Sequence, residues 1–408
     1  MGIHNTTIQS SEWLMNDFAA RTGVNGSGDS LRRYLWTDAF AVMTFLALHR
    51  RTGKQEYLNR ALHLVDLVHH VLGRHRRDDR RTGWISGLSK SEGESRPTAG
   101  GLRIGKPLSE RSAGEPFDER LEWQRDGQYF HYLTKWMHAL NLLSRETGDP
   151  KWNAQAIELA TTAYAAFVTI PHPGALPRMY WKMSIDLSRP LVPFMGQLDP
   201  LDGFVAFCRL QATQRHLGVD SPLLAQASKV MRQVCGSDAV WATTDALGIG
   251  GLLSEASHLV ELMASGDMPF DRMLAHLMAD TQRSLEEYTS GGELSLPCER
   301  RLAFRELGLA IGLQSIEPMY ALVHDRPERF GNAMSATSLL SRLEAMMRYV
   351  PLIEHIEEFW CAPAAQATTG WMEHRDINSV MLAHSLVRML KCKPANDVFD
   401  SGIFAARL

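Results

Sequence analysis

The stretch Arg51-Thr52-Gly53-Lys54 separates two apolar segments with helical spacing, and the chain repeats this arrangement three more times. The equivalent junctions read Glu146-Thr147-Gly148-Asp149, His216-Leu217-Gly218-Val219-Asp220 and Ala264-Ser265-Gly266-Asp267. A unit of helix, glycine turn and helix cannot bury its apolar face alone. The pattern therefore predicts stacked helical hairpins, either closed into a ring or left as an open solenoid.

Apolar periodicity places five helix pairs and one unpaired last helix along the chain. The predicted helices are Trp36–Arg51 with Glu56–Leu72, Gly127–Glu146 with Lys151–Val168, Asp202–His216 with Pro222–Val234, Ala246–Ala264 with Phe270–Tyr288, a segment from Cys298 with Asn332–Tyr349, and Asp376–Lys391. A helix at about residues 9–20 would partner the last one and close six hairpins into one all-α (α/α)6 toroid spanning residues 1–408. Ala175–Ile185 is the one expected strand hairpin.

The predicted connections are unequal in length. Within a pair they are short, whereas the links between pairs are long, above all the inserted loop of residues 74–125 and the segments 169–201, 289–297 and 351–375. All the long links lead into the first helix of a pair. Long loops on a rigid scaffold are a usual place for functional residues, so we expect the site at the end of the fold where these loops gather.

Composition excludes several classes of function. The 408 residues carry a formal charge of −3, which argues against a nucleic-acid partner, and no apolar run is long enough to cross a bilayer. No secretory signal is visible, and the five cysteines lie apart without a Cys-x-x-Cys pair. We therefore expect a cytoplasmic protein with no membrane partner, no metal site and no cofactor; the sequence leaves the oligomeric state open.

Acidic residues stand at the start of the presumed inner helices. They are Asp38, Asp126, Asp199, Asp202, Asp245, Glu299, Glu373 and Asp376. Aspartate is also a favoured helix N-cap, so any one of them has a structural interpretation. Aromatic and polar residues accompany them, namely Trp36, Trp123, Arg125, Gln128, Tyr129, His131, Trp181, Trp371 and His374. In a closed ring this set would converge on one cavity, where aromatic platforms and paired carboxylates suit glycosyl transfer.

The glycine-turn hairpins, with acids and aromatics at the inner helix starts, resemble the six-hairpin glycosidase superfamily of (α/α)6 toroids over about residues 9–391. This superfamily includes inverting glycoside hydrolases, unsaturated glucuronyl hydrolases and sugar 2-epimerases. The resemblance implies a carbohydrate site at the end where long loops enter the inner helices. The resemblance includes no family-specific catalytic signature.

We predict an inverting hydrolase acting on a small-molecule or oligosaccharide substrate. Asp126, next to Gly127, is the expected general acid and Asp202 the expected base, with Asp38 and Asp376 in support. Asp199 is expected to cap its helix with Pro200 behind it. The predicted substrate-binding residues are Trp36, Trp123, Arg125, Gln128, Tyr129, His131, Trp181, Asp199, Glu299, Trp371 and His374.

Two alternatives stay open. A metal-free sugar epimerase or isomerase would move protons with His131 and His374. A binding toroid without catalysis would use the acids only as caps. In the inserted loop, Arg103, Lys106 and Arg111 could form a lid that recognises a carboxylated or phosphorylated sugar, or the loop could be a surface insertion.

Overall fold

The glycine turns end their helices as the sequence predicts. After α2 (Leu35–Thr52), Gly53 adopts φ 70° and ψ 5° and donates its N–H to the His49 carbonyl at 2.8 Å. After α6 (Phe130–Thr147), Gly148 adopts nearly the same angles and donates to the Ser144 carbonyl. This left-handed backbone favours glycine, which lacks the Cβ that makes it costly for other residues. The turn reverses the chain so that the next helix packs antiparallel on the first.

The computed structural model describes residues 2–26, 32–172, 174–218, 221–236, 239–269 and 271–387. The chain divides into two compact units. One is Ala19–Gly236, which we call the loop-rich unit; the other combines Met1–Phe18 with Ser237–Leu408 and is called the helical unit. No helix in the described ranges is both long enough and apolar enough to cross a membrane.

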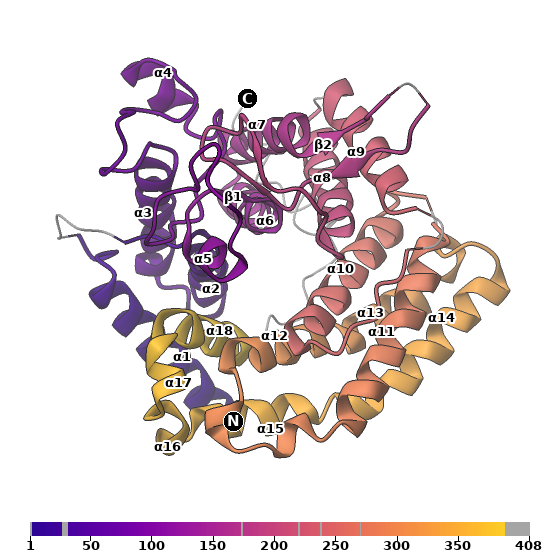
Figure 1. Cartoon of the computed structure of the whole chain (residues 1–408). Coiled ribbons are helices and arrows are strands. Elements are labelled where there is room, and N and C mark those ends of the chain that lie inside the picture. The colour runs from indigo at the N-terminus through magenta and orange to yellow at the C-terminus, as the bar shows by residue number, and fades with distance from the viewer. Residues whose placement is uncertain are drawn as a thin grey trace. The chain divides into compact units, whose positions relative to one another are not determined.

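Three helical hairpins build the loop-rich unit (Figure 1). They are α2 with α3 (Gln55–Leu72), α6 with α7 (Pro150–Phe167), and α8 (Asp199–His216) with α9 (Pro222–Val234). The first helices of the pairs pack side by side, with α6 in contact with both α2 and α8. The predicted pairs of this region are confirmed, although α6 begins three residues later than expected and α8 three residues earlier.

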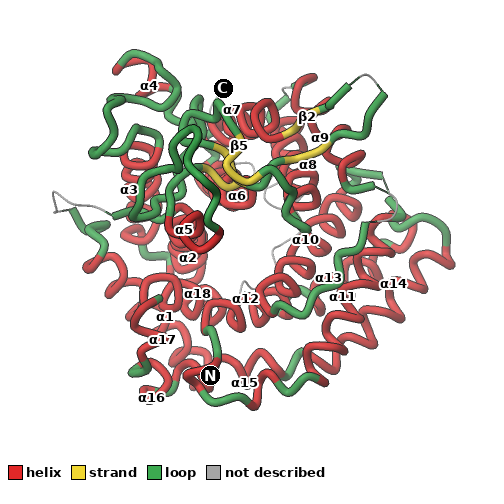
Figure 2. Tube along the Cα trace, in the orientation of Figure 1, coloured by secondary structure: helices red, strands yellow, loops and turns green. Residues whose placement is uncertain are grey.

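Short strands explain the late start of α6. Gln128 and Tyr129 form β1, which pairs antiparallel with β4 (Lys182–Met183), and β4 pairs with β5 (Pro190–Val192). β2 (Val168–Thr169) pairs with β3 (Arg178–Met179). The predicted hairpin within 175–185 is therefore wrong, because β3 and β4 each pair with a different strand. Figure 2 shows these strands and the long loops gathered around α6.

The inserted segment 74–125 contains two short helices, α4 (Lys90–Ser95) and α5 (Glu119–Gln124). Its backbone is tied to the starts of the inner helices. Leu35 N donates to the Ile104 carbonyl at 3.0 Å, and Ile104 N donates to the Gly127 carbonyl at 2.9 Å. The segment therefore lies over the first turns of α2 and α6.

The helical unit has a second run of packed helices, in which α12 contacts α10, α15 and α18. Its helices are α10 (Ala246–Ser265), α11 (Met273–Ser290), α12 (Ala303–Leu313), α13 (Ile316–Asp325), α14 (Ala333–Met346), α15 (Leu352–Cys361), α16 (Pro363–Gln366), α17 (Thr369–Glu373) and α18 (Arg375–Val387). Four 3₁₀ turns, at Glu293–Ser295, Cys298–Arg300, Pro327–Arg329 and Met347–Tyr349, link them. The sequence missed α15, which lies inside the expected loop 351–375.

The amino-terminal helix α1 (Gly2–Arg21) packs on α18. Ser11 Oγ donates to the Ala383 carbonyl at 3.1 Å, and Arg375 forms an ion pair with Asp17. The first helix thus partners the last described helix, as the sequence predicted for these two segments. The expected end of the last helix at Lys391 lies outside the described residues.

Candidate functional site

Asp126 accepts hydrogen bonds from several loop residues of the loop-rich unit. It is fully buried, and Arg103 donates to its Oδ2 at 2.6 Å and Arg76 at 3.3 Å. The backbone N–H groups of Gly105 and Lys106 donate to Oδ1 at 2.9 and 3.3 Å. A carboxylate with this many donors is fixed in place and turned away from solvent. These contacts favour a structural role and disfavour the predicted role as general acid.

Gln128 also joins loop segments. Its side chain accepts a hydrogen bond from Leu102 N at 2.9 Å and donates to the carbonyls of Gly100 and Ile185 at 2.9 and 2.7 Å. Because Gln128 is fully buried and its amide is satisfied by backbone groups, these contacts favour a structural role, and its predicted contact with substrate stays a prediction. Arg125 is likewise engaged, since it binds the Glu115 carboxylate through two nitrogens.

Asp38 lies one turn into α2, where it is buried. Its Oδ2 accepts the Tyr34 N–H at 3.1 Å and lies 3.6 Å from Arg33 Nε. Binding the N–H that precedes the helix stabilises the first turn. Asp202, on α8, forms an ion pair with Lys135 of α6 at 3.2 Å, and its side chain is 8% exposed. Its predicted role as a base stays a prediction.

Aromatic rings meet at the first turns of α2 and α6. Tyr129, the last residue before α6, lies 5.4 Å from the His131 ring and 5.3 Å from the Trp181 ring, measured between centroids. The Trp181 and Trp123 rings meet edge to face at 5.0 Å, and Trp123 is 46% exposed. On the other side of His131, Trp36 lies 6.1 Å away. The structure thus brings together all the aromatic residues that the sequence singled out in this unit.

Two further tyrosines belong to this cluster and were missed. Tyr132 lies 4.8 Å from His131 and 5.5 Å from Tyr34 between ring centroids, and the two tyrosine hydroxyls share a hydrogen bond. Burial raises the pKa of Tyr34, Tyr129 and Tyr132 above the usual value of 10.0. All three hydroxyls therefore stay protonated near neutral pH. The run Tyr129-Phe130-His131-Tyr132 was the available signal, since it places several such rings at one helix start.

A histidine–carboxylate pair lies within this aromatic cluster. His131 Nδ1, on the first turn of α6, is 3.5 Å from Asp199 Oδ1 at the start of α8. The His131 side chain is 24% exposed, whereas that of Asp199 is 5% exposed. Neither His131 Nδ1 nor Asp199 Oδ2 has a hydrogen bond within the described part of the chain. The pair therefore combines a solvent-reaching imidazole with a buried acid.

The burial of Asp199 has a local cause. A Cβ added at Gly196 would lie 2.8 Å from Asp199 Cγ, so the backbone at Gly196 covers the carboxylate. The expectation that Asp199 caps its helix is wrong, because Leu198 occupies the N-cap position and Asp199 is already helical. Its side chain is consequently left for His131 rather than for the helix amides.

The predicted residues of the helical unit do not form a comparable cluster among the described residues. Glu299, His374 and Asp376 are exposed. Trp371 is buried and stacks on Trp360 at 5.9 Å, while His374 meets the Phe304 ring edge to face at 5.8 Å. Trp371 therefore contributes to the core of this unit, and the roles expected for Glu299, His374 and Asp376 stay predictions.

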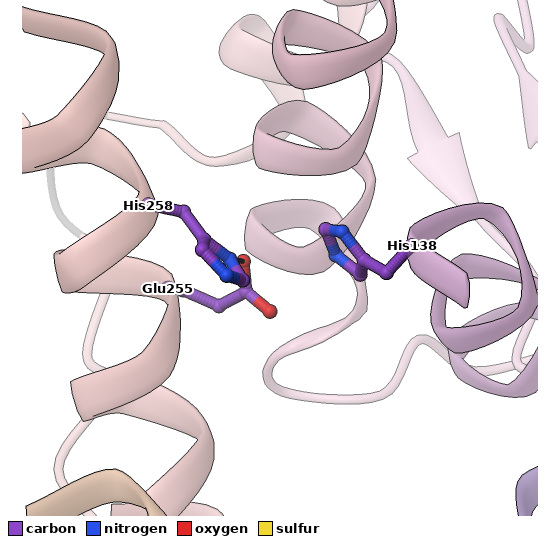
Figure 3. A group of neighbouring side chains, drawn as sticks. All are labelled: His138, Glu255 and His258. Carbon is purple, nitrogen blue, oxygen red and sulfur yellow. Dashed lines mark ion pairs between the residues drawn. The ribbon is translucent and has the colours of Figure 1, made fainter. Parts of the chain in front are cut away.

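Two sets of interacting polar residues in the helical unit were not predicted from the sequence. Figure 3 shows Glu255 and His258 extending from one side of α10, with 3.5 Å between His258 Nδ1 and Glu255 Oε2. Buried Glu306 binds Arg301 through two nitrogens and accepts a hydrogen bond from Trp360 Nε1 at 2.8 Å. His138, also drawn in Figure 3, is a buried residue of α6 in the loop-rich unit. The Glu-x-x-His spacing of Glu255 and His258 within an apolar helix was the sequence signal for that pair.

Comparison with known proteins gives the fold. No family model and no curated protein matches the chain. A crystal structure of D-mannose isomerase is similar with a TM-score of 0.50 and 10% identity, over 94% of this chain and 98% of that one. Cellobiose 2-epimerase from Spirochaeta thermophila DSM 6192 (TM-score 0.46, 14% identity, 87% and 86% covered) and a sugar epimerase from a ruminal bacterium (0.44, 11%, 88% and 88%) are also similar. The chain thus shares the all-α (α/α)6 toroid fold class of D-mannose isomerase.

Proposed function

We propose that the chain is a carbohydrate-processing enzyme that interconverts an aldose and its 2-ketose, with His131 as the proton-transfer group. The single observation that carries this proposal is the His131–Asp199 pair inside the aromatic cluster. D-mannose isomerase, whose fold the chain shares, supports a sugar as the substrate class.

The pair suits general acid–base chemistry. A carboxylate beside Nδ1 favours the tautomer in which Nδ1 carries the proton, which leaves the Nε2 lone pair available as a base. The same carboxylate stabilises the imidazolium formed after the proton is taken. Asp199 is here a positioning residue, since it acts through His131.

The surrounding rings suit a sugar. Pockets for small ligands combine aromatic walls with a few polar groups that fix orientation. Trp123 and Trp181 offer ring faces and edges for the apolar C–H groups of a sugar, and the Tyr34 and Tyr132 hydroxyls offer hydrogen bonds. One of these hydroxyls donates to the other, so the hydroxyl that accepts keeps its own proton, which it can donate to a carbonyl oxygen of the substrate.

Isomerisation needs one base acting on one face of the open-chain sugar. In this scheme His131 takes the proton from C2 of the aldose and an enediol forms. The proton then returns to C1, while the hydroxyl proton of O2 moves to O1, so the carbonyl shifts from C1 to C2 with no oxidant or reductant. Epimerisation by deprotonation would need a second group on the opposite face.

Inverting hydrolysis has weaker support. It needs a carboxylic acid that reaches the leaving oxygen, and the buried Asp126 already binds Arg76 and Arg103. Hydrolysis with Asp126 and Asp202 therefore stays a prediction from the sequence that no observation favours.

Deuterium exchange tests the proposal. D-mannose incubated with the protein in D₂O should yield the 2-ketose with deuterium at C1, which NMR detects. We expect His131→Asn to slow this reaction by about 10²–10⁴-fold, the usual contribution of a general base, and Asp199→Asn to slow it less.

His63→Asn is the matched control, because His63 is exposed on α3 and has no place in the cluster. Its rate should equal that of the wild-type protein. Exchange that persists in His131→Asn would reject His131 as the base. Binding of sugars without exchange or any product would favour the non-catalytic alternative.

A further inference from the structure

Lys106 is a cation held beside the aromatic cluster. Its backbone is fixed, because its N–H donates to Asp126 Oδ1 at 3.3 Å and its carbonyl accepts a hydrogen bond from Arg76 at 2.7 Å. Its side chain is half-buried, and the ammonium lies 5.2 Å from the centroid of the Tyr34 ring. The local fold therefore places this charge on one ring of the proposed site.

The neighbouring cations of the inserted loop and its contacts have carboxylate partners. Arg103 and Arg76 bind Asp126, Arg111 and Lys182 bind Glu122, and Arg125 binds Glu115. Lys106 has no carboxylate within ion-pair distance among the residues that the structure describes. Asp126 is close enough to influence it, but that carboxylate already binds two guanidinium groups.

An uncompensated cation in a half-buried place is costly. Burial, reinforced by the charge of Lys182, lowers the pKa of the Lys106 ammonium. A bound anion would offset this cost by supplying the missing charge partner. Of the three residues predicted to recognise an anionic sugar, Arg103 and Arg111 bind acids of the protein itself. Lys106 is the one that remains available for a ligand.

Lys106 also connects to the reacting group of the proposed site. The Tyr34 ring that it faces contacts the Tyr132 ring, and Tyr132 contacts His131. We infer that the substrate is a sugar bearing an anionic group, a carboxylate or a phosphate, and that Lys106 binds this group while His131 faces the carbon that loses its proton. The inference rests on the proposed function, whose site it shares.

Binding measurements with matched sugars test this inference. D-mannose, D-mannuronate and D-mannose 6-phosphate should be titrated calorimetrically against the wild-type protein and Lys106→Gln. We expect at least one anionic sugar to bind tenfold or more tightly than D-mannose, and Lys106→Gln to remove most of that difference. Lys106→Arg should retain it. The separate titrations of uronate and phosphate show which anion the site takes.

Lys151→Gln is the control, since Lys151 also lies over an aromatic ring, that of Trp152 at 4.2 Å, but on the exposed start of α7. It should leave all three affinities unchanged, and thermal unfolding checks that each variant is folded. Equal affinity for the three sugars, or equal loss for all three in Lys106→Gln, would overturn the inference. Charge-dependent binding without His131-dependent exchange would instead contradict the proposed isomerase and leave the anion site standing.

Discussion

The two units use the same scaffold and differ in their loops. In each, the first helices of successive hairpins pack together, α2, α6 and α8 in the loop-rich unit and α10, α12 and α18 in the helical unit. Left-handed glycines follow α2 and α6 in the first and α10 in the second. Among the described residues, only the loop-rich unit carries long, bonded segments over its helix starts, and there the aromatic and histidine residues meet. Chemistry is thus added by loops to a common helical frame.

The two units also bury charge differently. In the loop-rich unit, Asp126 joins segments of a loop through Arg76, Arg103 and backbone N–H groups. In the helical unit, Glu306 on α12 binds Arg301 and the Trp360 indole of α15. One acid holds loops in place, and the other fixes the packing of helices.

The largest expected effect comes from removing the acid that holds the loops. Asp126→Ala leaves Arg103 buried without its carboxylate, and breaking such a pair costs about 3–5 kcal/mol. Glu306→Ala should cost a similar amount in the helical unit, measured by urea unfolding. The two variants should differ in limited proteolysis, because only Asp126→Ala frees residues 74–125 for cleavage. Asp126→Asn that is fully stable yet inactive would restore Asp126 as a candidate acid.

The difference between helices and loops explains which parts of the fold could be predicted from the sequence. Periodicity and the glycine turns are local signals, so they placed the main helices within a few residues. The pairing of Gln128 and Tyr129 with Lys182 and Met183 depends on residues more than 50 positions apart, and periodicity carries no sign of it. The start of α6 was misplaced for that reason.

The site was predicted in composition but not in roles. Trp36, Tyr129, His131 and Trp181 do meet, because they lie near the starts of packed inner helices or, for Trp181, directly before strand β4 beside them. Asp126 was chosen for its neighbour Gly127, yet its partners come from residues 76 and 103–106. An acid's role depends on such distant donors, which a single sequence does not reveal.

Buried histidines give a second comparison between the units. Burial lowers the pKa of His69 on α3 to about 3 and that of His384 on α18 to about 4, from 6.5. Below pH 6.5 these histidines are protonated in the unfolded chain but remain neutral in the folded chain. The free energy of unfolding therefore falls as the pH falls from 6.5 toward these values. Each histidine contributes up to about 1.4 kcal/mol per pH unit in this window.

His69→Gln tests this linkage in the loop-rich unit. His69 Nε2 accepts a hydrogen bond from Trp136 Nε1 at 3.1 Å, and a glutamine oxygen can replace that acceptor. Unfolding free energies between pH 7.5 and 4.5 should fall less steeply in His69→Gln than in the wild type. Trp136→Phe is the control, since it removes the donor and keeps the titrating ring. An unchanged slope in His69→Gln would contradict the linkage.

The smallest effects should be the same in both units, because the glycine turns are common to them. Gly53 and Gly148 have φ near 70° with open space where a Cβ would lie, so alanine there pays only the backbone cost of about 1–2 kcal/mol. Gly266, at φ 83° in the helical unit, would also place a Cβ 3.0 Å from the Arg329 guanidinium, a flexible group that can yield. We expect all three Gly→Ala variants to lower the unfolding free energy by a similar amount in urea titrations.

Gly370→Ala is the control, because Gly370 in α17 has neither a positive φ nor a nearby atom, and this variant should be neutral or slightly stabilising. A much larger loss at Gly53 or Gly148 than at Gly266 would mean that the loop-rich unit depends on its turns in a way that the shared helical frame does not explain.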